Sequence, residues 1–227
     1  MTSPRQMALD LPLEPRFGRE DFLVSPSNAA AWEMFERWPQ WPDRILLLLG
    51  PTGSGKSHLA AIWAARTKAR VLSGRSLPLA DLPALAGSGA ILLEDADSAS
   101  GVERELFHLV NLVRESSSWL VITGRRWPDG WNLATPDLLS RLRLAPAVEI
   151  GEPDDALVRA VLVKLFVDRQ LVVDTSVVEY LGVRIERSLD AARNIVEALD
   201  REALALGRPV TRPMAGDVLR RLEERTG

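Results

Sequence analysis

The stretch "ILLLLGPTGSGKS", residues 45 to 57, decides the fold. It opens with a continuous apolar run, which is typical of a strand buried on both faces. The run enters a glycine-rich loop that satisfies the pattern G-x-x-x-x-G-K-S/T. Glycines let backbone N–H groups turn inward around phosphate oxygens, and the N-terminus of a following helix adds partial positive charge. The stretch therefore predicts a strand, a phosphate-binding loop and a helix, in that order.

The same loop predicts how a nucleotide is held. Lys56 is expected to reach the β- and γ-phosphates, and Ser57 is expected to ligate Mg²⁺. The other nucleotide-binding positions are the rest of the loop and the residue that follows it, namely Gly50, Pro51, Thr52, Gly53, Ser54, Gly55 and His58. The expected cofactors are therefore ATP or ADP together with Mg²⁺.

Strands and helices alternate on either side of this loop. Three further apolar runs predict strands: "AILLED" at 90–95, "WLVITG" at 119–124 and "AVEI" at 147–150. One helical pattern follows the glycine loop at 57–67, and a second occupies 102–116. Such alternation is typical of an α/β fold with a parallel sheet and helices on both faces.

The organisation of the chain follows from where this alternation begins and stops. Prolines interrupt residues 1–24, which we expect to form an extended arm. The α/β core is expected over 25–152. The last part, 153–227, contains only helical patterns and predicts a small all-helical lid.

Polar side chains at two strand ends are candidates for the second half of the site. Glu94 and Asp95 follow an apolar strand, and ligands of α/β sheets bind at the carboxyl ends of strands. Either carboxylate could hold Mg²⁺ or orient the attacking water, and the sequence leaves the choice open. The strand at 119–124 is expected to lie between the strand at 45–49 and the strand at 90–95. Thr123, near its end, would then lie beside the γ-phosphate as a polar sensor.

Composition excludes several classes of protein. The net charge of -3 gives no overall basic field for nucleic acid, so direct sequence-specific DNA binding is not favoured. Without cysteine the chain has neither disulfides nor thiolate metal sites. The longest apolar run is far too short to span a bilayer, and the first residues lack a signal peptide. A cytoplasmic protein without a membrane partner is expected.

Three motifs together resemble the Hda-like branch of the DnaA-related AAA+ ATPases. "GKSHL" at 55–59 resembles the "GKTHL" of the DnaA initiator and its relatives. "WNLATPDLLSRL" at 131–142 resembles the stretch that leads into the arginine finger of these regulators. "QMALDLPL" at 6–13 resembles their sliding-clamp-binding peptide. The likeness runs from residue 6 to about 222, and the DNA-reading helix-turn-helix of the initiator is missing from it.

The resemblance implies a fold, partners and roles. It implies an AAA+ P-loop core followed by a helical lid. Gln6, Leu9 and Leu11 would anchor the chain to the DNA polymerase sliding clamp. Arg141 would act as an arginine finger that promotes ATP hydrolysis by a DnaA partner, with Arg143 as the competing candidate. Replication initiation would thereby be down-regulated. Two alternatives remain open, an autonomous ATPase of the helicase-loader type and a nucleotide-binding scaffold that hydrolyses nothing.

Three departures from the family pattern argue against vigorous hydrolysis by this chain alone. Glu94 stands where an Asp usually holds magnesium, and Arg125 where Asp is usual. Asp190 aligns with the lid arginine that contacts phosphate, and its charge would repel a phosphate. Arg187 and Arg193 lie one helical turn to either side and are the candidate substitutes, unless they serve only to solvate the helix. The sequence does not say whether two copies form a homodimer.

Overall fold

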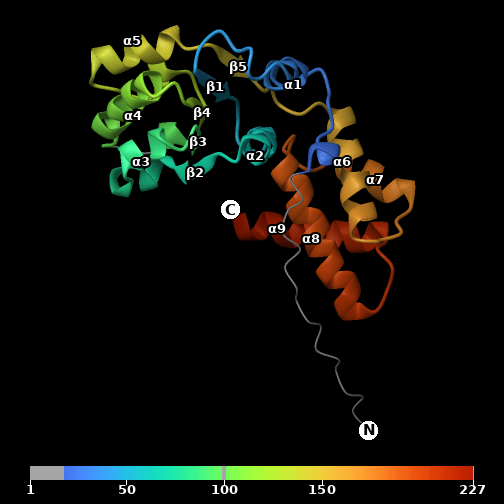
Figure 1. Cartoon of the computed structure of the whole chain (residues 1–227). Helices are drawn as coiled ribbons and strands as arrows, with labels where there is room; N and C mark the ends of the chain where they lie inside the picture. The colour runs from blue at the N-terminus through green and yellow to red at the C-terminus, as the bar shows by residue number, and fades with distance from the viewer. Residues whose placement is uncertain (1–17, 99–100, 227) are drawn as a thin grey trace. The chain divides into compact units, whose positions relative to one another are not determined.

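A computed structural model describes residues 18–98 and 101–226 (Figure 1). The chain divides into two units, a core that extends to Pro153 and a helical unit that begins at Asp154. Among the described residues, the core contains two buried apolar clusters and the helical unit contains a third.

The core is built on a parallel five-stranded sheet. Its strands are β1 (Ile45–Leu49), β2 (Arg70–Ser73), β3 (Ala90–Glu94), β4 (Trp119–Gly124) and β5 (Ala147–Glu149). They lie in the order β2-β3-β4-β1-β5, and each adjacent pair is parallel. The insertion of β4 between β1 and β3 is confirmed. The edge strand β2 was not predicted from the sequence.

One helix precedes the first strand, and the others lie between consecutive strands. The core helices are α1 (Ala29–Glu36), α2 (Lys56–Thr67), α3 (Leu82–Ala86), α4 (Glu103–Glu115) and α5 (Pro136–Leu144). Short 3-10 turns lie at η1 (Arg19–Asp21), η2 (Gly74–Leu79), η3 (Ala96–Ser98) and η4 (Pro128–Gly130). The α2 and α4 helices lie where the sequence predicted them, whereas α3 was not foreseen.

Alternating side chains of the strands bury both faces of the sheet. In β1, Ile45, Leu47 and Leu49 face a cluster completed by α3, α4 and α5, whereas Leu46 and Leu48 face α1 and α2. Figure 1 shows these two groups of helices on opposite sides of the strands. An apolar residue at every position of a central strand follows from this two-sided burial. As a result, α2 and α5 lie on opposite faces.

The segment just before α1 packs on the core. Phe22 stacks on Trp32 of α1 at 5.1 Å between ring centroids. The ring of His58, in α2, hydrogen-bonds through Nε2 to the carbonyl oxygen of Gly18 at 3.1 Å. The extended arm expected up to residue 24 therefore does not include residues from Gly18 onward.

The helical unit contains α6 (Asp155–Asp168), α7 (Thr175–Gly182), α8 (Leu189–Leu206) and α9 (Arg212–Thr226). Asp154, Asp174 and Ser188 cap the first three of these, because each side chain accepts a bond from a backbone N–H of the first turn. The helices pack around their own core, in which Leu162, Leu199 and their neighbours are fully buried. This part of the chain is all-helical, as the sequence predicted.

Candidate functional site

The glycine loop between β1 and α2 has a backbone that glycine alone accommodates. Gly50, Gly53 and Gly55 have φ angles of 147°, 72° and 99°. A Cβ atom on Gly50 would lie 2.2 Å from the carbonyl oxygen of Ile150, so any side chain there would displace the strand end. Gly55 is the N-cap residue of α2, in the left-handed conformation. The loop thus turns into the helix N-terminus, which is the geometry that a phosphate site requires.

Lys56 is held inside this loop. Its side chain is buried, and Nζ donates to the carbonyl oxygens of Gly50 at 2.6 Å and Pro51 at 2.7 Å. The hydroxyl of Ser54 is also buried, and it has no hydrogen-bond partner among the residues that the structure describes. A buried cation beside an unsatisfied polar atom is suited to an anionic ligand that supplies further acceptors.

The carboxylate of Glu94 lies next to Ser57. Its pKa is raised by burial first and by the neighbouring charge of Asp95 second, while a hydrogen bond with the Ser57 side chain lowers it. The structure therefore brings together two of the residues expected to hold Mg²⁺. It favours Glu94 over Asp95 as the partner of Ser57, whereas Asp95 is exposed and has a positive φ of 51°.

Thr123 supports the residue after β3. Its side chain is buried, and Oγ1 accepts a hydrogen bond from the backbone N–H of Asp95 at 2.9 Å. This contact joins the ends of β3 and β4 at the carboxyl edge of the sheet. A role for Thr123 as sensor of the γ-phosphate stays a prediction. Arg125 follows β4, and its backbone N–H donates to the carboxylate of Asp97, which follows β3, at 2.9 Å. This bond is a second link between the ends of the two strands.

These side chains fit a magnesium ion that also binds phosphate. Mg²⁺ is usually held by one or two carboxylates plus phosphate oxygens and water, rather than by a complete protein cage. Consistently, the described residues contain no group of three or more His, Cys, Asp or Glu side chains placed to hold a metal ion. Ser57 and Glu94 would hold the ion beside the loop, where it would neutralise charge on the phosphates.

Arg141 and Arg143 have different surroundings on α5. The guanidinium of Arg143 forms an ion pair with Asp129, and its Nε donates to Asp129 Oδ1 at 3.0 Å. The guanidinium of Arg141 lies over the ring of Phe107 in α4, 5.2 Å from the centroid. It pairs with no carboxylate in the part of the chain that the structure describes. Of the two, Arg141 is therefore the one whose charge is available to another molecule.

Phe107 was missed by the sequence interpretation, although the pattern of α4 contains a signal. Leu106, Leu109, Val110 and Val113 form the buried stripe of this helix. Phe107 lies beside that stripe and is only partly buried. Its ring packs on the edge of the core cluster and also supports the guanidinium of Arg141.

The remaining predicted site residues are described by their own contacts. His58 contacts the carbonyl of Gly18 and the edge of Phe22. Arg187 and Arg193 belong to the helical unit, where they pair with Asp155 at 3.0 Å and Asp190 at 3.5 Å. The clamp-binding positions Gln6, Leu9 and Leu11 lie outside the described residues.

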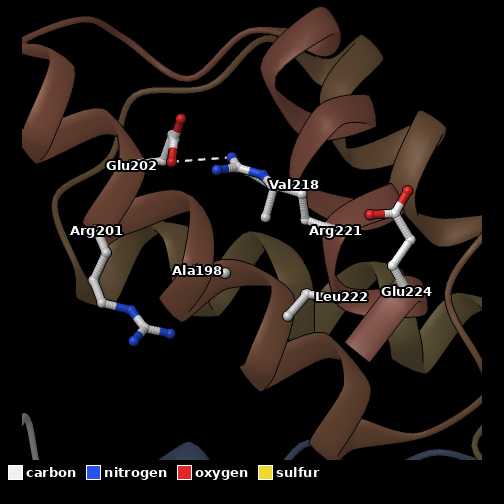
Figure 2. A pocket seen from close by; sticks show the side chains of 7 residues that line it. All are labelled: Ala198, Arg201, Glu202, Val218, Arg221, Leu222 and Glu224. Atoms are coloured by element: carbon white, nitrogen blue, oxygen red, sulfur yellow. Dashed lines mark ion pairs between the residues drawn. The ribbon is translucent and has the colours of Figure 1, made fainter. Parts of the chain in front are cut away.

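The helical unit carries a hollow of about 540 Å³ between α8 and α9. Figure 2 shows its wall, where Glu202 and Arg221 form an ion pair at 3.0 Å. Val218 and Leu222 contribute apolar atoms to the same wall (Figure 2). Its lining combines both signs of charge with aliphatic groups and brings together none of the residues expected to bind the nucleotide.

Sequence comparison finds similarity to the chromosomal replication initiator protein DnaA. The chain is 27% identical over 241 residues to the chromosomal replication initiator protein DnaA of Thermomicrobium roseum, covering 92% of this chain and 50% of that protein. It is 25% identical over 181 residues to DnaA of Mesorhizobium japonicum, covering 67% and 36%. The chain thus spans about half the length, or less, of these relatives. No model of a protein family matches it.

Solved structures give the fold. Domain III of DnaA from Thermotoga maritima superposes with a TM-score of 0.76 at 21% identity, covering 92% of this chain and 98% of that one. AMPPCP-bound DnaA from Aquifex aeolicus gives a TM-score of 0.71 at 20% identity, covering 86% and 69%. The chain therefore has the α/β fold of an AAA+ P-loop NTPase. Among its described residues, no helix has both the length and the apolar character needed to cross a membrane.

Proposed function

We propose that this chain is a nucleotide-bound, DnaA-related AAA+ regulator that docks on the sliding clamp and stimulates ATP hydrolysis by DnaA. Two features of the core support the proposal together. The phosphate loop is complete, with Lys56 held inside it and Glu94 beside Ser57. Among the described residues no carboxylate pairs with Arg141, which lies on the sheet face opposite α2, the helix that follows the phosphate-binding loop.

The observation that carries the proposal is the environment of Arg141. An arginine finger must keep its charge and reach a γ-phosphate held by another molecule. Arg141 is held by an aromatic ring rather than by a carboxylate, so no ion pair has to break before it binds a phosphate. Arg143 would first have to leave Asp129.

Nucleotide is proposed to act mainly as a structural ligand. ATP or ADP with Mg²⁺ would bind at the loop and stabilise the arrangement from which Arg141 reaches its partner, because a ligand shifts the population toward the state that it binds best. The DnaA of Aquifex aeolicus was solved with bound AMPPCP, and a nucleotide is the corresponding ligand proposed here.

Clamp docking is proposed for the segment that contains Gln6, Leu9 and Leu11. Short peptides with one polar and two apolar anchors bind grooves by ordering on the partner. Docking on a clamp would raise the local concentration of the chain near DNA-bound initiator.

The decisive experiment measures ATP hydrolysis by DnaA with the purified chain and DNA-loaded clamp. We expect acceleration that is lost in Arg141→Ala and reduced in a Gln6→Ala/Leu9→Ala double variant. Arg143→Ala is the matched control on the same helix, and it should retain most of the stimulation. Full stimulation by Arg141→Ala would remove the finger assignment.

A second candidate function is an autonomous ATPase. It is favoured by the contact between Ser57 and Glu94 and by the hydrogen bond between Thr123 and the backbone of Asp95, because these contacts bring candidate Mg²⁺ and sensor residues of one chain together. Turnover by the purified protein alone separates the two functions. Substantial hydrolysis without DnaA or clamp would support the ATPase, and retention of ADP through purification would support the regulator.

A further inference from the structure

The loop that leads into α5 is held by a single carboxylate from α4. Glu103 Oε1 accepts a hydrogen bond from the backbone N–H of Ala134 at 2.8 Å. Glu103 Oε2 accepts two more from Thr135, one from its backbone N–H at 2.9 Å and one from its hydroxyl at 2.8 Å. Three donors from the last two residues before the helix thus converge on one side chain.

This arrangement replaces the usual cap of α5. Thr135 is the N-cap residue of that helix, and its hydroxyl would ordinarily accept a bond from the first turn. Here the hydroxyl donates to Glu103 instead. The start of α5 is therefore fixed from outside the helix, by a residue more than 30 positions earlier in the chain.

A second contact joins the same two helices one turn further on. Phe107 is four residues after Glu103, so both side chains lie on the same face of α4. The ring of Phe107 lies under the guanidinium of Arg141. One face of α4 thus holds both the beginning of α5 and the arginine that α5 carries.

We propose that Glu103 is a positioning residue for the arginine finger, because it sets where α5 begins and hence where Arg141 projects. The inference rests on the proposed function for the role of Arg141, but the anchor itself is a property of this chain. Reactions that depend on the position of a charged group are sensitive to displacement, and about 1 Å of misplacement can cost about 100-fold in rate.

The charge state of Glu103 is consistent with this role. The bond from the backbone of Ala134, and then that from the hydroxyl of Thr135, lower the pKa of its carboxyl. The side chain is therefore ionised at neutral pH, when a carboxylate accepts on both oxygens.

The test uses the full chain in the stimulated DnaA assay, with three variants that remove different numbers of the bonds. Glu103→Ala removes all three, and stimulation at saturating chain should fall about 10- to 100-fold. Glu103→Gln keeps one oxygen acceptor and should retain an intermediate rate. Thr135→Val removes only the hydroxyl bond and should lose the least. Glu105→Ala, in the same turn of α4, is the matched control and should behave like the wild type.

A double variant separates positioning from general destabilisation. If Glu103 acts through Arg141, Glu103→Ala should cause a much smaller loss in a chain that carries Arg141→Lys, which keeps the charge and part of the stimulation, than it causes in the wild type. The concentration of chain at half-maximal stimulation and its affinity for ADP should stay unchanged, since neither the Glu103 contacts nor the contact between Phe107 and Arg141 involves the phosphate-binding loop. Full stimulation by Glu103→Ala, or an additive loss in the double variant, would overturn the inference.

Hydrogen exchange provides a readout that does not depend on DnaA. The amides of Ala134 and Thr135 should be protected in the wild type and should exchange faster in Glu103→Ala, without faster exchange in β1. If the wild-type chain stimulated nothing, the proposed function would fail, and exchange alone would decide the anchor. Equal exchange of these two amides in both proteins would refute it.

Discussion

At the scale of single residues, Lys56 has two sets of possible partners. In the structure its ammonium donates to the carbonyls of Gly50 and Pro51, and a bound nucleotide would offer charged phosphate oxygens instead. Hydrogen bonds between charged groups are about twice as strong as neutral ones. A nucleotide is therefore expected to compete well for this side chain.

The first prediction concerns that competition. Lys56→Ala should raise the Kd for ADP about 10- to 100-fold, the range expected for loss of one charged hydrogen-bonding group. Isothermal titration calorimetry measures the change. Lys68→Ala, an exposed lysine just after α2, is the control and should bind ADP as the wild type does. Equal affinity in Lys56→Ala would mean that the loop is not the nucleotide site.

The second prediction concerns Glu94. Its pKa is raised on folding, so the folded chain binds a proton more readily than the unfolded chain between the two pKa values. Stability therefore falls as the pH rises through that interval, and the unfavourable contribution persists above it. Glu94→Gln should raise the melting temperature of the nucleotide-free protein above that interval and remove this part of the pH dependence.

The same variant, Glu94→Gln, should also weaken the binding of Mg²⁺. Loss of a carboxylate beside Ser57 should weaken Mg²⁺ binding at least about 10-fold in the presence of ATP. Thermal melts across pH, with and without Mg²⁺ and ATP, measure both effects. Asp95→Asn is the comparison, because that exposed side chain is not the partner of Ser57. A lower melting temperature for Glu94→Gln would contradict the argument.

The sequence predicted those parts of the site that are local along the chain. The phosphate loop is one contiguous motif, so its residues could be named directly. The choice between Glu94 and Asp95 could not be made, because it depends on which carboxylate turns toward Ser57 across the sheet edge. The role of Glu103 could not be foreseen either, since its three bonds join segments far apart in sequence.

At the scale of elements, burial decided which strands could be predicted. The central strands β1, β3 and β4 are almost fully buried and are nearly continuous apolar runs. The edge strand β2 has mostly exposed side chains, including two polar ones, so it lacks an apolar run. A strand at a sheet edge is formed by pairing with its neighbour, and this signal is absent from its own composition.

Helices followed the same rule. Long helices such as α4 and α8 display an apolar stripe of several turns. The α3 helix has five residues, one of them Pro83 near its start, and no periodic pattern can be recognised over so short a span. Its stability comes from the cap by Asp81 and from packing of Leu85.

The third prediction compares two ways in which α8 contributes to the helical unit. Leu199 is fully buried, and Leu199→Ala should destabilise the unit by about 2–5 kcal/mol through lost burial and a cavity. The ion pair between Glu202 and Arg221 lies on the surface, with 30% and 53% of the side chains exposed (Figure 2). Arg221→Ala should therefore cost less than about 1 kcal/mol. Urea unfolding followed by circular dichroism tests the ranking, and the opposite order would contradict it.

At the scale of the whole molecule, the two units have separate cores. The sheet of the core unit is buried between two layers of helices, and α6 to α9 enclose a third apolar cluster. A unit with its own core can in principle unfold independently. A nucleotide bound at the loop interacts first with the core unit, because Lys56, Ser57 and Glu94 all belong to it.

The fourth prediction follows from this independence. Differential scanning calorimetry of the nucleotide-free chain should show two transitions rather than one. ADP at about 100 times its Kd should stabilise the core unit by about 2.7 kcal/mol and raise its transition by about 10 °C. The transition of the helical unit should rise less, because Arg187 and Arg193 already pair with carboxylates. Leu199→Ala identifies the helical transition, since it should lower that one alone.

Each result of this calorimetry has a definite meaning for how the chain responds to nucleotide. Two transitions with the larger ADP shift in the core would place most of the binding energy in the phosphate loop and its carboxylate. A larger shift of the helical transition, lost in an Arg187→Ala/Arg193→Ala double variant, would instead mean that these arginines exchange their carboxylates for phosphate. A single transition that moves as a whole, in the wild type and in Leu199→Ala alike, would contradict the independence of the two cores. The core pattern is expected because the two units have separate buried clusters and the phosphate-binding loop belongs to the core unit.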